Sequence, residues 1–472
     1  MAKVFLFDII ENMKISKSWH LPLVGFFVML IITVFYWNIQ YNYFYMDDFH
    51  WISRAITAQN SFAGIFSIEG RDFNPVFLAI LSLIIKICGP SVPVLRLFTL
   101  LSFAAAITAF FYVLWHHFKV HPVIAISAAL CTALNVFVSE AVLNLAALVY
   151  PLSLLFALLA IKFYWDDKKW LYLLFMVLAF FTKETAVLII LPLFLYEKEK
   201  TRRLFLAVSG LAFIAIRITL QWGATASYTG FMETENLGYK FYFILLRSMN
   251  LSPYSIPLST GIIIVVVLFL IGGYFLFVKK ERGFLFFLFC YGFFALFFAL
   301  LPKLSSRYLL FPSIGFWGIA ALLAHYFYSV KKNRVLLYAF ISFLLVVLLF
   351  NYPVVQREIE DYKILGDFSK EFVQKEGNHI KGLLKNLQPT EKSGPVEIAI
   401  YKGDHHRLAE MYRHIQWRNN LPKLLPFREH SIGGVIEPKH LLPLIFYPQR
   451  AEWKTVLEDT TSFKGKIMLA GE

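Results

Sequence analysis

The chain has 472 residues, of which 58% are apolar and only 16% are charged, whereas a soluble domain carries about 25% charged residues. The net charge of +14 does not indicate a nucleic-acid-binding protein, because the basic residues form short clusters between apolar runs. The three cysteines all fall within apolar segments and are too few for a disulfide framework or a metal cluster. The composition therefore excludes a soluble globular domain and predicts an all-α polytopic membrane protein.

The apolar runs predict about eleven transmembrane helices, because each run is nearly long enough to cross a hydrocarbon layer of ~30 Å. The stretch 75–88 is shorter and contains Lys86, so we expect a juxtamembrane or re-entrant helix on the outer face. Counting it as a span would place most later basic clusters outside the cell. The expected spans are 21–40, 93–115, 122–138, 145–165, 170–182, 185–196, 204–221, 260–278, 284–301, 308–328 and 335–352.

The loops between these spans carry their Lys and Arg residues mainly on one side, for example Lys168, Lys169, Arg202 and Arg203. The positive-inside rule makes that side cytoplasmic. The N-terminus is therefore expected on the cytoplasmic side of the inner or plasma membrane. The first apolar run has no small-residue cleavage site and is expected to remain as an anchor.

The composition becomes mixed and polar after about residue 352, which predicts two domains. Residues 1–352 would form the transmembrane domain, and residues 353–472 a small α/β domain in the extracytoplasmic space. Within the second domain, the stretch 396–401 alternates like a strand and the stretch 407–417 can form a helix.

Two adjacent carboxylates, Asp47 and Asp48, follow directly after the first span in an aromatic-rich segment. Charged groups at the membrane surface are costly unless they are paired or used, and two neighbouring carboxylates raise one pKa towards that of a useful base. The alternative is that the pair caps a helix that begins near Phe49, because Asp is a favoured N-cap residue.

Further charged residues fall on the same predicted face. Glu140 is the acidic residue of the loop after the third span, Lys183 and Glu184 lie between the fifth and sixth spans, and Arg307 precedes the tenth span. Each cation alone is more often an interfacial residue than a ligand. Together they place carboxylates and cations on one surface, as an enzyme of anionic lipid substrates needs.

This order of segments resembles the glycosyltransferases of the GT-C fold, in the branch of the protein O-mannosyltransferases and the aminoarabinose lipid A transferases. The resemblance covers roughly residues 20–330 and rests on Asp47-Asp48, on the short helix that follows them, on Glu140, on the stretch 181–185 and on the stretch 307–315. The C-terminal tail departs from the pattern.

The resemblance implies transfer of a sugar from a polyprenyl-phosphate carrier to a hydroxyl of a protein, lipid or glycan at the outer face, with inversion. An alcohol is a poor nucleophile, so a carboxylate must take its proton. Asp47 is assigned this role, with Asp48 as a substitute or orienting group. The departing phosphate needs fixed positive charge. Lys183 and Arg307 are the first candidates and Arg71 and Arg247 weaker ones, while Glu140, Glu184 and His50 are candidates for contacting the acceptor or orienting other groups.

A divalent metal has oxygen ligands available in Asp47, Asp48 and Glu140. Since the second outer loop has no Asp-x-Asp pair, and since the resembling enzymes that use monosaccharyl phosphate carriers generally need no ion, we expect neither a metal nor another cofactor.

Two other functions remain open. A transporter or flippase of lipid-linked glycans would show inverted repeats and paired broken helices, and no such pair is visible in the sequence. A polymerase or ligase of lipid-linked glycans would use Arg and His in a long late outer loop, and the loop from about 222 to 257 has no His. A purely structural membrane protein would leave the Asp pair unexplained.

Overall fold

The computed structural model describes residues 17–44, 47–59, 62–66, 73–221, 237–250, 274, 282–301, 305–331, 334–386, 397–401, 442–447, 452–455 and 466–471. The chain forms two compact units. The first comprises residues 1–40, 66–77 and 93–360, and the second comprises residues 41–65, 78–92 and 361–472.

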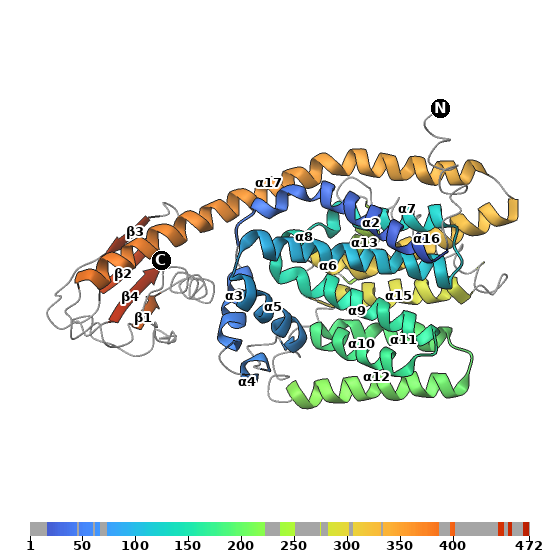
Figure 1. The fold of residues 1–472 in the computed structure, drawn as a ribbon, viewed down its shortest axis with the longest axis horizontal. Helices are drawn as coiled ribbons and strands as arrows, with labels where there is room; N and C mark the ends of the chain where they lie inside the picture. Colours follow the sequence, from blue (N-terminus) through green and yellow to red (C-terminus); the bar gives the residue numbers. More distant parts are fainter. Residues whose placement is uncertain are drawn as a thin grey trace. The chain divides into compact units, whose positions relative to one another are not determined.

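The first unit is a bundle of helices (Figure 1). Several of these helices have bounds close to those of the predicted spans. Helices α9 and α10 pack side by side, as do α15 and α16, and α11 packs against both α12 and α15. The elements are α2 (Lys17–Phe35), η1 (Trp37–Tyr41), α6 (Val92–Tyr112), η2 (Val113–His117), α7 (Pro122–Ala133), η3 (Val136–Val138), α8 (Glu140–Leu143), η4 (Leu145–Leu148), α9 (Val149–Trp165), α10 (Lys169–Thr182), η5 (Glu184–Ile189), α11 (Ile190–Tyr196), α12 (Lys200–Gln221), α13 (Leu237–Ser248), α15 (Arg282–Ala299), η8 (Ser306–Leu309), α16 (Leu310–Lys331) and the first part of α17 (Arg334–Asn386).

Among the described residues, four helical stretches are long and apolar enough to cross a membrane, and a bent pair makes a fifth. Further apolar helices of 10–17 residues include Lys169–Thr182 and Glu184–Tyr196. The chain is therefore a helical membrane protein with several apolar helices. The number of eleven spans stays a prediction, and the expected span 260–278 falls almost entirely outside the described residues.

The expected span 122–138 is not one continuous helix. Helix α7 ends at Ala133, and the following turns η3 and α8 continue at an angle of 61° to it. Asn135 accounts for the break, because its side chain accepts a hydrogen bond from the N–H of Phe137 at 2.9 Å and so begins a new turn. The sequence missed this break because the residues around Asn135 are as apolar as a span.

Side chains from distant helices satisfy the backbone groups that the break releases. The Tyr36 hydroxyl donates to the Ala133 carbonyl at 3.1 Å, and the Asn351 amide donates to the Leu134 carbonyl at 2.5 Å. The Asn250 amide oxygen accepts from the Val136 N–H at 3.3 Å, and the almost fully buried Arg96 donates to the Leu143 carbonyl at 2.8 Å. These bonds let an irregular backbone persist within an apolar bundle.

Helices α15 and α16 approach each other closely through glycines. A Cβ atom on Gly315 would lie 2.5 Å from the backbone nitrogen of Tyr291, and one on Gly318 would lie 2.2 Å from the ring of Phe287. Small residues at such crossings let helix backbones approach in the absence of a hydrophobic driving force.

The second unit holds helices and a sheet. Its helices are α3 (Asp47–Ala58), α4 (Phe62–Ile65), α5 (Pro75–Cys88) from Leu78 onward and α17 from Asp361 onward. The Ser82 hydroxyl of α5 donates to the Ala55 carbonyl of α3 at 2.9 Å. The helix that we expected at 75–88 is confirmed as a helix with these bounds.

The sheet has four strands in the order β1-β4-β2-β3. Strand β4 (Lys466–Gly471) pairs in parallel with both β1 (Glu397–Tyr401) and β2 (Leu442–Tyr447), and β2 pairs antiparallel with β3 (Glu452–Thr455). The strand predicted at 396–401 is thus confirmed as β1. The helix predicted at 407–417 lies outside the described residues.

Helix α17 runs without interruption across position 352, where we expected the second domain to begin. The polar residues that follow continue the helix, because Glu, Lys and Gln are good helix formers. The division into domains at 352 and 353 stays a prediction.

We predict that Gly315→Ala destabilises the protein, because the added methyl group meets backbone atoms of Tyr291 that cannot turn aside. Overpacking of this kind costs about 1–3 kcal/mol, which thermal unfolding in detergent micelles will register as a lower midpoint. Gly292→Ala is the matched control, since a Cβ atom on Gly292 meets nothing within 4 Å. Equal midpoints for the two variants would contradict the close approach.

Candidate functional site

Lys183 lies at the turn between α10 and η5. Helix α10 ends at Thr182, and Lys183 adopts an extended backbone with φ of −155° and ψ of 124° before η5 begins at Glu184. The Lys183 ammonium lies 3.2 Å from a carboxylate oxygen of Glu184, and both side chains are largely buried. The two charges that we predicted between the fifth and sixth spans are therefore brought together as an ion pair.

Glu184 also pairs with Arg217, near the end of α12. The guanidinium lies 3.4 Å from the second carboxylate oxygen of Glu184 and donates to the Phe73 carbonyl at 3.1 Å. One carboxylate is thus shared by two cations. The sequence analysis did not select Arg217, although an ionisable residue inside an apolar run is a functional candidate by default.

Two tyrosine rings connect Lys183 with Arg307. The Lys183 ammonium lies 6.0 Å from the ring centre of Tyr150, and this ring contacts that of Tyr308 edge-on at 5.6 Å. The Arg307 guanidinium lies 5.7 Å from the Tyr308 ring. Tyr308 is itself stacked on Phe298 at 5.1 Å. Two cations from distant loops therefore lie around the same pair of rings.

Glu140 holds the turn that carries Arg307. One carboxylate oxygen accepts the Ser305 hydroxyl at 2.6 Å and the backbone N–H of Arg307 at 3.1 Å. The other oxygen lies 3.9 Å from the Arg307 guanidinium. Bonds to a charged acceptor are about twice as strong as neutral ones, so Glu140 fixes the position of this turn. Whether it also contacts an acceptor stays a prediction.

These residues form a cluster that we call the anion site: Lys183, Arg217, Arg307, Tyr150 and Tyr308, with Glu184 and Glu140 beside them. Among the residues named here, three cations lie with two carboxylates. Tyr150 is almost fully buried beside these charges, and charges interact more strongly in a buried environment than in water.

Arg247 lies beside the broken helix, at the end of α13. Its guanidinium lies 3.7 Å from the ring centre of Phe243 and 4.9 Å from that of Phe137, and its carbonyl accepts from Asn135 at 2.9 Å. Its backbone thus supports the break. Arg71, the other weaker candidate, lies outside the described residues.

Asp47, Asp48 and His50 belong to helix α3 of the second unit. The helix begins at Asp47, so the two carboxylates occupy its first turn, where acidic residues suit the helix dipole. Asp48 is almost completely buried, and His50 is half-buried with its ring edge-on to Trp51. The Asp47 side chain lies outside the description. That Asp47 shares a pocket with Lys183 and Arg307 stays a prediction.

Within the described part of the chain, no three His, Cys, Asp or Glu side chains are grouped in a way that could hold a metal ion. The anion site has only two carboxylates, and each is already paired with a cation.

No protein-family model and no curated protein matches the chain. Two solved structures of ArnT from Cupriavidus metallidurans are similar to it. The one bound to undecaprenyl phosphate is 14% identical, with 86% of each chain covered and a TM-score of 0.46. The apo structure is 12% identical, with 90% of this chain and 89% of that chain covered and a TM-score of 0.49.

ArnT is an aminoarabinose lipid A transferase of the GT-C fold.

We predict that Glu140→Gln lowers the stability of the first unit, because an amide keeps one acceptor but removes the charge that holds Ser305 and Arg307. Loss of bonds to a charged group costs about 1.5–3 kcal/mol, measurable as a lower thermal midpoint in detergent. Glu199→Gln removes a carboxylate from an exposed side chain and serves as the control. A midpoint unchanged by Glu140→Gln would show that the turn is held by other contacts.

Proposed function

We propose that this protein is a membrane glycosyltransferase that moves a sugar from a polyprenyl-phosphate carrier to a hydroxyl acceptor at the outer face of the membrane. The observation that supports it is the placement of Lys183 and Arg307 around Tyr150 and Tyr308. Both cations were selected from the sequence as phosphate ligands, and they come from loops far apart along the chain.

The charge of the anion site suits this chemistry. A sugar linked through a phosphodiester carries one negative charge, and the released monoester gains a second. Fixed cations at the phosphate stabilise that growing charge more than they stabilise the bound donor, which is the condition for lowering the barrier. Lys183 supplies a compact charge, and Arg307 supplies a planar fork that can donate two parallel hydrogen bonds to phosphate oxygens.

The other half of the proposed reaction needs a base. Asp47 takes the proton of the acceptor hydroxyl while the hydroxyl oxygen attacks the anomeric carbon from the side opposite the phosphate. The bond between this carbon and the phosphate oxygen breaks, and its electron pair leaves on the phosphate. The sugar is then transferred with inversion. Asp48 orients Asp47 or replaces it, and no metal takes part in this scheme.

A transporter or flippase of lipid-linked glycans is the second candidate. The bent pair α7 and α8 favours it, because broken helices line the substrate sites of many transporters. The two functions differ in whether a covalent bond changes. Vesicles containing the full-length protein and a labelled polyprenyl-phosphate sugar distinguish sugar transfer from net movement of an intact lipid.

We predict that Lys183→Gln and Arg307→Gln each lower kcat/KM for transfer from polyprenyl-phosphate sugars by roughly 10²–10³, as loss of a charge-stabilising donor does. Asp47→Asn keeps the size of the side chain and removes the base, so kcat falls by roughly 10²–10⁴. The assay uses the full-length protein in proteoliposomes with a panel of labelled donors and acceptors.

Lys168→Gln provides the control, because it removes one positive charge from an exposed residue of a different loop. Full transfer by the Asp47 variant would remove Asp47 from the mechanism. Full transfer by both the Lys183 and the Arg307 variants would remove the anion site from it.

A further inference from the structure

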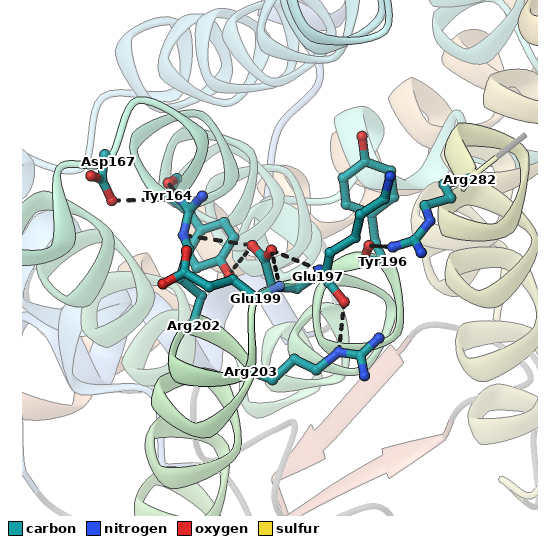
Figure 2. A network of polar contacts seen from close by, with 9 residues as sticks. Tyr164, Asp167, Tyr196, Glu197, Glu199, Arg202, Arg203 and Arg282 are labelled. Carbon is teal, nitrogen blue, oxygen red and sulfur yellow. Dashed lines mark hydrogen bonds and ion pairs between the residues drawn. The ribbon is translucent and has the colours of Figure 1, made fainter.

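A second polar cluster lies at the other end of α9 from the anion site. Tyr150 stands in the first turn of α9 and Tyr164 in its last. Figure 2 shows Tyr164 within a network that also takes in Glu197, Arg202, Arg203 and Arg282. The network joins the ends of α9, α11, α12 and α15.

Glu197 organises this network. One of its carboxylate oxygens accepts the Tyr164 hydroxyl at 2.6 Å, and the other accepts the N–H groups of Lys198 and Glu199 at 2.7 and 3.0 Å. Burial alone would raise the pKa of Glu197, but these hydrogen bonds and the nearby Arg202 together hold it below its ordinary value. Glu197 is therefore ionised at neutral pH and keeps its turn in one conformation.

Arg202 belongs to the structural part of the network. It donates to the Tyr164 carbonyl at 2.6 Å and lies 3.6 Å from Glu197 and 3.7 Å from Asp167. Its charge is thus offset by two carboxylates.

Arg203 and Arg282 differ from Arg202. Arg203 donates its Nε–H to the Glu197 carbonyl at 2.6 Å, and Arg282 donates to the adjacent Tyr196 carbonyl at 3.2 Å (Figure 2). These carbonyls end helix α11, where the helix dipole favours cations. Within the described residues neither guanidinium is paired with a carboxylate. Each is held by one edge and keeps further N–H groups for another acceptor.

An apolar stripe begins next to these arginines. Leu204, Val208 and Leu211 follow Arg203 on one face of α12 and are 64%, 58% and 67% exposed. In a membrane protein such a face contacts acyl chains. Two fixed cations therefore lie at the level where the apolar face of α12 begins, which is where lipid head groups lie.

We propose that Arg203 and Arg282 bind the phosphodiester of an anionic phospholipid, with its acyl chains along the exposed face of α12. The positive-inside rule explains why basic residues gather in these loops. It does not explain why two guanidiniums from different helices are held on consecutive carbonyls without a carboxylate partner among the described residues, whereas the neighbouring Arg202 lies near two carboxylates. A phosphate oxygen acceptor supplies the missing negative charge, and guanidinium forks match its geometry.

Native mass spectrometry of the full-length protein, incubated with phosphatidylglycerol or with phosphatidylcholine, tests this proposal. The wild type is expected to retain phosphatidylglycerol roughly thirtyfold better than phosphatidylcholine, as two basic residues near a membrane surface provide. Combined Arg203→Gln and Arg282→Gln should abolish the preference. Combined Lys198→Gln and Lys200→Gln removes the same charge from exposed residues and should leave most of the preference.

Three results would overturn the proposal. The first is that the wild type shows no preference for phosphatidylglycerol, a result that requires no variant. The second is an equal loss in the lysine variant, because the preference would then reflect general surface charge. The third is displacement of the lipid by inorganic phosphate alone at equal concentration. If the glutamine variant does not insert, Arg203→Lys with Arg282→Lys keeps the charge and removes the forks, and it should retain several-fold less phosphatidylglycerol than the wild type.

Discussion

Where a buried helix is broken, the peptide groups that leave the helix need other hydrogen-bond partners. The first unit contains such a break, and several of its helices supply these partners. Helix α7 stops at Ala133, and apart from the four residues of α8 the α-helix resumes only at Val149. The residues between these helices are mostly buried, so water cannot form hydrogen bonds with their backbone groups. Tyr36, Arg96, Asn250 and Asn351 come from four separate parts of the chain to do so. The break thereby determines which helices must lie next to one another.

The same break also helps to position the side chains of the anion site. It ends in the short helix that Glu140 begins, and Glu140 binds the turn of Arg307. Arg307 in turn lies at the ring of Tyr308, which contacts Tyr150 at the start of α9. These contacts connect the helix break at Asn135 with the position of Arg307 in the anion site. The turn of Lys183 reaches the same rings independently from α10.

The ends of several helices could be predicted from the sequence, because a change from apolar to charged residues marks them. The predicted spans 170–182 and 185–196 nearly coincide with α10 and with η5 and α11. The end of α7 could not be predicted, since it depends on Asn135 and on partners more than one hundred residues away. The structure brings Lys183 next to Glu184 and Glu140 next to Arg307, and the functional roles assigned to these residues stay predictions. Arg217 was not selected from the sequence, because its pairing with Glu184 is visible only in three dimensions. Whether Asp47 joins them stays a prediction.

Helix α9 has a polar anchor at both ends, since Tyr150 lies in the anion site and Tyr164 in the network of Glu197. The two tyrosines are separated by a helical rise of about 21 Å. A rod fastened at both ends resists tilting and sliding, because either motion must break bonds at one end or the other. In the reaction proposed above, loading of a lipid and release of a product would leave this rod in place and move the short turns η5 and η8, which carry Glu184 and Arg307.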